Sequence, residues 1–139
     1  MNPMESESFP VTTAQLVRNM GTDAIPTQII VSVYTNMIYL MITQTGKVGT
    51  LTMAKKDHLL SESSVLLGDR SNLLYSVYAN HISSLLASQK TLLLACSLLK
   101  PAIDPDNQDA IDSWNKAVFD DVLSGLKELG FLQPEHDNE

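Results

Sequence analysis

The sequence predicts an α+β fold, an antiparallel β-sheet (a meander plus additional strands) with two amphipathic helices packed on one face. Residues 25–54 hold three strand-like runs in close succession, and two later segments repeat apolar residues at helical spacing. The chain has 139 residues, of which 44% are hydrophobic and 18% charged. This length and composition suit one globular domain with its own core.

The three runs span residues 27–34, 37–44 and 48–54. β-Branched residues, tyrosines and alternating polarity favour strands over helices here. Thr35-Asn36 separates the first two runs and Thr45-Gly46 lies in the second break, where glycine supplies the positive φ that a tight turn needs. The sequence therefore predicts a meander in which each run pairs with the next.

Pairing through two-residue turns sends successive side chains to opposite faces of the sheet. One face becomes almost purely aliphatic, with Ile29, Val31, Val33, Ile38, Leu40, Ile42, Leu51 and Met53. The other is mixed, and its Tyr and Met residues are types enriched at protein–protein interfaces. The alternative is that another part of the chain covers it. The candidate partner-binding residues on the mixed face are Ile30, Ser32, Tyr34, Met37, Tyr39, Met41, Thr50 and Thr52.

The other elements follow from local signals. A strand over 14–20 ends at Gly21, and a short strand over 64–67 ends at Gly68. Asp69 or Ser71 can cap a helix over 72–88. The most apolar run, 91–99, is expected as a central strand covered on both faces.

The last helix is expected to start at Asp106, Asn107 or Asp109 and to run to about Glu128, with Gly130 marking its end. The predicted order is β-βββ-β-α-β-α. We expect a flexible tail over 1–13, one domain over 14–130 and an acidic tail over 131–139.

The net charge of −7 is concentrated near the C-terminus, where residues 104–139 hold ten acidic residues against two lysines. This balance argues against nucleic-acid binding, which needs clustered Lys and Arg. No apolar run is long enough to span a bilayer, and the first ten residues lack the apolar core of a signal peptide. The single cysteine fits a reducing compartment, so we expect the cytoplasm or the nucleus.

No catalytic, metal or cofactor motif emerges from the sequence. Residues 46–50, GKVGT, lack the spacing and the hydroxyl residue of a phosphate-binding loop. His58, His81 and His136 are scattered, and Cys96 lies among Leu and Ala, where a thiol is usually inert. An enzyme that uses Cys96 would need an accessible thiol of low pKa.

Three segments resemble the proteasome assembly chaperone 3 family. They are IPTQ at 25–28, TQTGKVGTL at 43–51 and VLLG at 65–68, and the resemblance extends over about residues 25–99. It implies a non-catalytic chaperone that helps α-subunits assemble into the ring of the proteasome core particle and then leaves. It also implies a dimer with the related proteasome assembly chaperone 4, or with a second copy of itself.

The α-subunit contacts are expected at loops that the sheet holds out to solvent. The candidates are the turn around Lys47 and the loop that begins with Lys55 and Lys56. The other class that the sequence leaves open is a permanent dimeric adaptor of the roadblock or longin type, which would reside stably in a larger complex.

Overall fold

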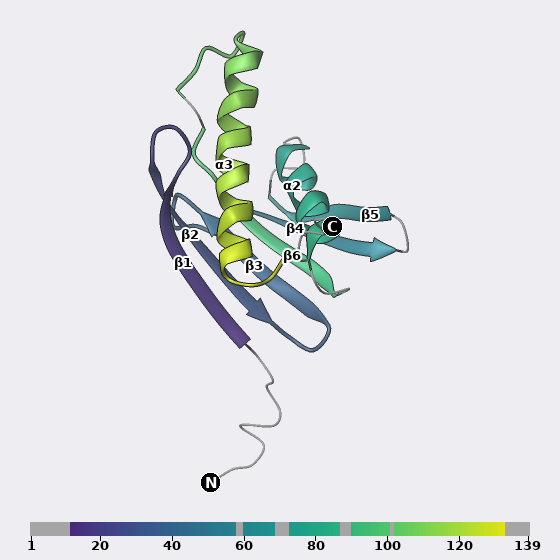
Figure 1. Ribbon diagram of the computed structural model, residues 1–139. Coiled ribbons are helices and arrows are strands. Elements are labelled where there is room, and N and C mark those ends of the chain that lie inside the picture. The colour runs from purple at the N-terminus through teal and green to yellow at the C-terminus, as the bar shows by residue number, and fades with distance from the viewer. Residues whose placement is uncertain (1–11, 58–59, 69–72, 87–89, 101, 133–139) are drawn as a thin grey trace, which may run out of the picture.

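The computed structural model describes residues 12–57, 60–68, 73–86, 90–100 and 102–132. The fold is α+β, with six strands in one mixed, mostly antiparallel sheet and two helices (Figure 1). The strands are β1 (Thr12–Met20), β2 (Ile25–Val33), β3 (Met37–Thr43), β4 (Thr50–Asp57), β5 (Leu60–Leu67) and β6 (Thr91–Ser97). The helices are α2 (Leu73–Leu85) and α3 (Gln108–Glu128). The predicted element order is confirmed, although β5 begins at Leu60 rather than Ser64.

The strand order in the sheet is β1-β2-β3-β6-β4-β5. β6 pairs in parallel with β3, and the other neighbouring strands are antiparallel. The predicted pairing of the second and third runs is therefore wrong, because β6 lies between β3 and β4. β6 is the most apolar strand, and the central place lets both of its edges form backbone hydrogen bonds while its side chains join the core.

The connection between β3 and β4 crosses the end of β6, and Gly49 makes this crossing possible. Gly49 has a φ of +70°, and a Cβ atom there would lie 2.3 Å from the carbonyl oxygen of Cys96. Gln44 N donates to Ser97 O at 2.8 Å, and the hydroxyls of Thr45 and Ser97 are 2.6 Å apart. The second glycine of the GKVGT segment thus serves close backbone approach rather than a two-residue turn.

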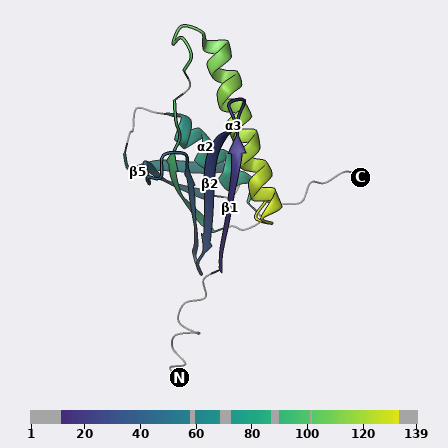
Figure 2. The same ribbon diagram turned by 90° about the vertical axis from the view of Figure 1, so that its left-hand side faces the viewer.

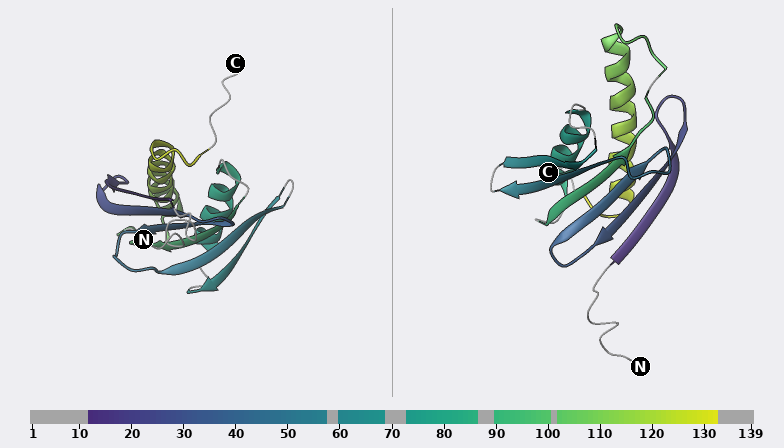
Figure 3. Two further views of the ribbon diagram at one scale, coloured as in Figure 1. Left: turned by 90° about the horizontal axis from the view of Figure 1, so that it is seen from below. Right: turned by 180° about the vertical axis from the view of Figure 1, so that it is seen from behind.

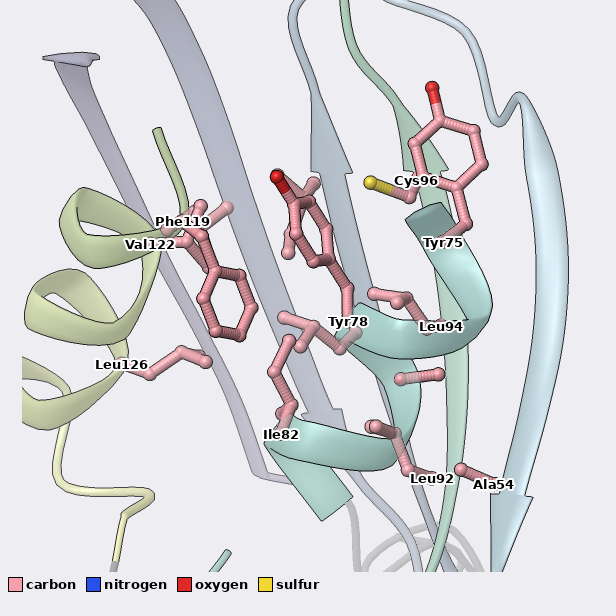
Figure 4. Close-up of a cluster of buried hydrophobic side chains, with 14 of the residues drawn as sticks. Ala54, Tyr75, Tyr78, Ile82, Leu92, Leu94, Cys96, Phe119, Val122 and Leu126 are labelled. Carbon is pink, nitrogen blue, oxygen red and sulfur yellow. The ribbon is translucent and has the colours of Figure 1, made fainter. Parts of the chain in front are cut away.

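Both helices lie on one face of the sheet (Figures 2 and 3), as predicted. Figure 4 shows Tyr78 and Ile82 of α2 beside Phe119, Val122 and Leu126 of α3, with Leu92, Leu94 and Cys96 of β6 beneath them. The buried sheet residues alternate along each strand, as in Ile29 and Val31 or Ile38, Leu40 and Ile42. These side chains form the core between the sheet and the helices.

The alternation in β4 is opposite to the prediction. Thr50, Thr52 and Ala54 lie in the buried face, with 5%, 0% and 0% of their surface exposed. Leu51 and Met53 consequently point to the other face, together with Tyr39 and Met41. The prediction paired β4 with β3, whereas β4 pairs with β6 and β5. This wrong pairing assigned the side chains of β4 to the wrong faces of the sheet.

The ends of α3 match the sequence signals. The Asn107 side chain accepts a hydrogen bond from Ala110 N at 3.2 Å, which identifies the N-cap among the three predicted candidates. Gly130 follows the helix with a φ of +87°. Asp121 accepts from Gly21 N at 2.7 Å, and Arg18 forms an ion pair with Glu128, so these polar contacts join α3 to β1 and the turn after it.

Candidate partner-binding surface

The described residues form no catalytic centre. Cys96 is fully buried, and this burial raises the pKa of its thiol, which disfavours the reactive thiolate. His81 is exposed and lies against the Phe119 ring, while His58 and His136 fall outside the described residues. Within the described ranges no three His, Cys, Asp or Glu side chains gather to hold a metal ion.

The sheet face opposite the helices carries two rows of side chains that run across four strands. The first row is Ile30, Met41, Ala95 and Leu51, and the second is Ser32, Tyr39, Leu93 and Met53, each residue paired with the next across the sheet. We call these eight residues the open face. Ala95 is buried and the others are half-buried. Neither helix covers the open face (Figure 3).

The open face contains no charged residue and is apolar apart from Ser32 and the Tyr39 hydroxyl. It continues to the edge strand β5 through Leu67, which pairs with Leu51 and is 64% exposed. An apolar patch that spans several strands is typical of an interaction surface. Charge depletion with Tyr and Met present is the composition found at interface cores.

The structure brings together only some of the predicted dimer-face residues. Ile30, Ser32, Tyr39 and Met41 lie in the open face, and Met37 extends it along β3 by alternation with the buried Ile38. Tyr34 lies at the β2–β3 turn, where its N–H donates to Met37 O and its carbonyl accepts from Lys90. Thr50 and Thr52 do not belong to this surface, because both are buried on the helix side.

Four open-face residues were missed by the sequence analysis: Leu51, Met53, Leu93 and Ala95. Nothing in the sequence of β6 distinguishes its two faces, because residues 92, 93 and 94 are all leucine; only the structure shows that Leu92 and Leu94 are fully buried and Leu93 is not. A strand buried equally on both faces, as predicted for β6, would not show this difference. Leu51 and Met53 required the correct strand order.

The three candidate lysines do not form one patch. Lys47 is exposed in the β3–β4 connection, before the first residue of β4. Lys55 is exposed near the other end of β4, and at about 3.3 Å per residue roughly 17 Å of strand separates it from Thr50. The Lys56 side chain lies outside the described residues. A partner that contacts all three would have to extend along β4.

The segment from β3 to the first turns of α3 matches a known family. Comparison with protein families matches residues 40–113, more than half of the chain, to proteasome assembly chaperone 3. The chain belongs to the proteasome assembly chaperone 3 family. The matched range includes the crossing connection at Gly49, α2 and β6.

Membership in the proteasome assembly chaperone 3 family gives the chain a role in proteasome assembly that involves no catalysis. This agrees with a site made of an apolar surface rather than of reactive groups. No curated protein matches the chain. None of the described helices is both long and apolar enough to cross a membrane.

Proposed function

We propose that this protein promotes assembly of the α-subunit ring of the proteasome core particle as a dimer formed through its open face. Its partner in the dimer is the related proteasome assembly chaperone 4 or a second copy of the same chain. The observation that supports the dimer is the uncharged open face, which spans β2, β3, β6 and β4 and lies opposite both helices. Family membership supports the target.

The proposed α-subunit contacts are not among the eight residues of the open face, although Lys55 projects to the same side of β4 as Leu51 and Met53. They lie at the exposed Lys47 and at Lys55 and Lys56, near opposite ends of β4. Polar, exposed contacts suit a chaperone that must leave its client, because such contacts are individually weak. The protein would act where proteasomes assemble, in the cytoplasm or the nucleus.

The test is co-purification of the full chain with purified proteasome α-subunits and, separately, with finished core particles. We expect capture of α-subunits and absence from the finished particle. Failure to capture any α-subunit would contradict the proposal. Full stoichiometry in finished particles would also contradict it and would indicate a permanent subunit of the adaptor class.

A further inference from the structure

A cavity of about 150 Å³ lies between the first turn of α2, the first half of α3 and the segment that follows β6. Its apolar wall includes Leu74 of α2, Leu98 after β6, and Ile111, Trp114 and Val118 of α3. Lys100 also lines it. The cavity is on the helix side of the sheet, so the open face and the proposed dimer leave it accessible.

Hydrogen bonds fix the backbone that borders the cavity. Leu98 N donates to the Tyr75 hydroxyl at 3.2 Å, and Leu99 N donates to Gln44 Oε1 at 2.8 Å. The Gln44 amide in turn donates to the buried Thr27 hydroxyl at 3.0 Å. Between the two helices, the Tyr78 hydroxyl donates to Asn115 O at 3.2 Å. The cavity is therefore built into the fold, as binding sites usually are.

The size of the cavity selects the kind of group that fits. Small-molecule and cofactor pockets usually measure about 300–1,000 Å³, well above the volume found here. The lining also includes the polar side chains of Gln44, Tyr75 and Asn115. A cavity of about 150 Å³ with an apolar wall is large enough for one benzene-sized group. The cavity thus fits a single Leu- or Phe-sized side chain better than a whole metabolite.

The positive charge of Lys100 indicates which group should lie beside the inserted side chain in the partner segment. Lys100 is exposed, and none of the ion pairs or hydrogen bonds formed among the described residues uses its ammonium group. Two carboxylates of α3 interact with groups other than Lys100: Asp112 accepts a hydrogen bond from Gln108 at 2.8 Å, and Asp120 forms an ion pair with Lys116. A carboxylate close to the inserted side chain would find its counter-charge at Lys100.

We propose that this cavity binds one apolar side chain of the client α-subunit, with a carboxylate of the same segment placed against Lys100. The inference rests on the proposed function, since it adds a recognition site to a protein-binding chaperone. It places this site on the helix side of the sheet, opposite the open face, and none of the three candidate lysines lines it.

The first test uses small probes and the full wild-type chain. N-acetyl-leucine, N-acetyl-leucinamide and N-acetylglycine are titrated while NMR follows the Trp114 indole and the backbone amides of Leu98, Leu99 and Asn115. We expect saturable shifts with N-acetyl-leucine, weaker binding of the neutral amide by several-fold and no binding of N-acetylglycine. Equal shifts with all three probes, or no saturable shift, would overturn the proposal.

The second test uses variants whose fold is checked by circular dichroism. Ile111→Trp fills the cavity and should abolish the shifts. Lys100→Glu should weaken N-acetyl-leucine binding several-fold and leave the amide unaffected. Lys116→Glu is the matched control, because it makes the same charge change on α3 outside the cavity lining. It should change the binding of neither N-acetyl-leucine nor N-acetyl-leucinamide. If Ile111→Trp does not fold, the titrations of the wild type and of Lys100→Glu still test the proposal, because each has its own expected result.

Capture of purified α-subunits separates this proposal from the proposed function. If the wild type captures α-subunits and both cavity variants capture them equally well, the cavity proposal is overturned and the chaperone function stands. If the wild type captures none while N-acetyl-leucine still binds, the α-subunit assignment fails and the cavity site stands. A change of dimer mass in Ile111→Trp would instead identify the cavity as a contact between chains and would overturn the proposal.

Discussion

The rings of Tyr78 and Phe119 stack, with centroids 4.4 Å apart and 19° between their planes. This contact joins α2 to α3 above the sheet, and the Tyr78 hydroxyl adds a hydrogen bond to Asn115 O. Stacked aromatic pairs contribute about 0.5–1.5 kcal/mol beyond the area that they bury. The two helices are therefore held to each other as well as to the strands beneath them.

We expect Tyr78→Phe to keep the stacking and to lose about 1 kcal/mol of stability at neutral pH, because one hydrogen bond disappears. Burial raises the pKa of the Tyr78 hydroxyl above its usual value of 10.0. The folded state therefore disfavours ionisation of this hydroxyl. The stability that un-ionised Tyr78 contributes is fully present below pH 10, the usual pKa, and is lost as the pH rises from there towards the higher pKa of the folded state. Urea unfolding at pH 7 and at pH 11 should show the deficit of the variant shrinking; a constant difference would contradict this account.

Gly49→Ala should destabilise the fold far more than Gly46→Ala. Both glycines have positive φ, at +70° and +79°, so an alanine is strained at either position by about 1–2 kcal/mol. Only at Gly49 would the new Cβ meet backbone, whereas at Gly46 nothing lies within 4 Å. The overpacking should add roughly 1–3 kcal/mol at Gly49. Equal melting temperatures for the two variants would show that the crossing over β6 is looser than described.

Tyr39→Asp or Met41→Asp should split the dimer and leave the fold intact. Each places a charge in the open face, and an unpaired charge in a buried interface costs roughly 3–5 kcal/mol. The dimer dissociation constant should therefore rise at least about 100-fold. Light scattering measures the mass and circular dichroism the fold. Val77→Asp is the control and should leave the dimer intact, because Val77 lies on α2, away from the open face, and is already 58% exposed. A dimeric Tyr39→Asp variant would refute the assignment of this face.

Reversing the charge of Lys47, Lys55 and Lys56 together should weaken α-subunit capture and leave the dimer unchanged. Exposed ion pairs contribute about 0.2–1 kcal/mol each, so the triple variant should bind roughly tenfold more weakly. The difference from the wild type should shrink at high salt, where such pairs are screened. Surface plasmon resonance at two salt concentrations measures both effects, and capture at wild-type strength at low salt would exclude these lysines.

Cys96→Ala should keep partner binding and lose roughly 1 kcal/mol of stability, because it leaves a small cavity beneath α2. In the native wild type, a thiol reagent should label Cys96 no faster than the protein unfolds. The reason is that the side chain is fully buried and its raised pKa disfavours the thiolate. Rapid labelling of the folded protein would argue for a reactive role.

The element types and the two-layer arrangement could be predicted because they depend on local signals. Alternation identified β2 and β3, helical spacing identified α2 and α3, and the capping residues near Asn107 located the start of α3. The strand order could not be predicted in this way. Pairing β3 with β4 was the simplest choice for consecutive strands, and nothing local in residues 44–49 reveals that β6 must fit between them.

The candidate site depended on that strand order. The residues contributed by β2 and β3, such as Tyr39 and Met41, were found because their own hairpin was right. Thr50 and Thr52 were placed on the wrong face because the side chains of β4 were assigned from a neighbour that it does not have. Side-chain alternation gives the two faces of a strand, and only the pairing tells which of them meets the core.

The central position of β6 has a consequence for how the chain folds during synthesis. The β2–β3 and β4–β5 hairpins contain only neighbouring residues and leave the ribosome first. Until residues 91–97 follow, the inner edges of β3 and β4 are unpaired, and such edges readily accept foreign strands. The strand that pairs with both of these edges is thus the last of the six to be made, and the two halves of the sheet of this assembly factor can join only after it has been synthesised.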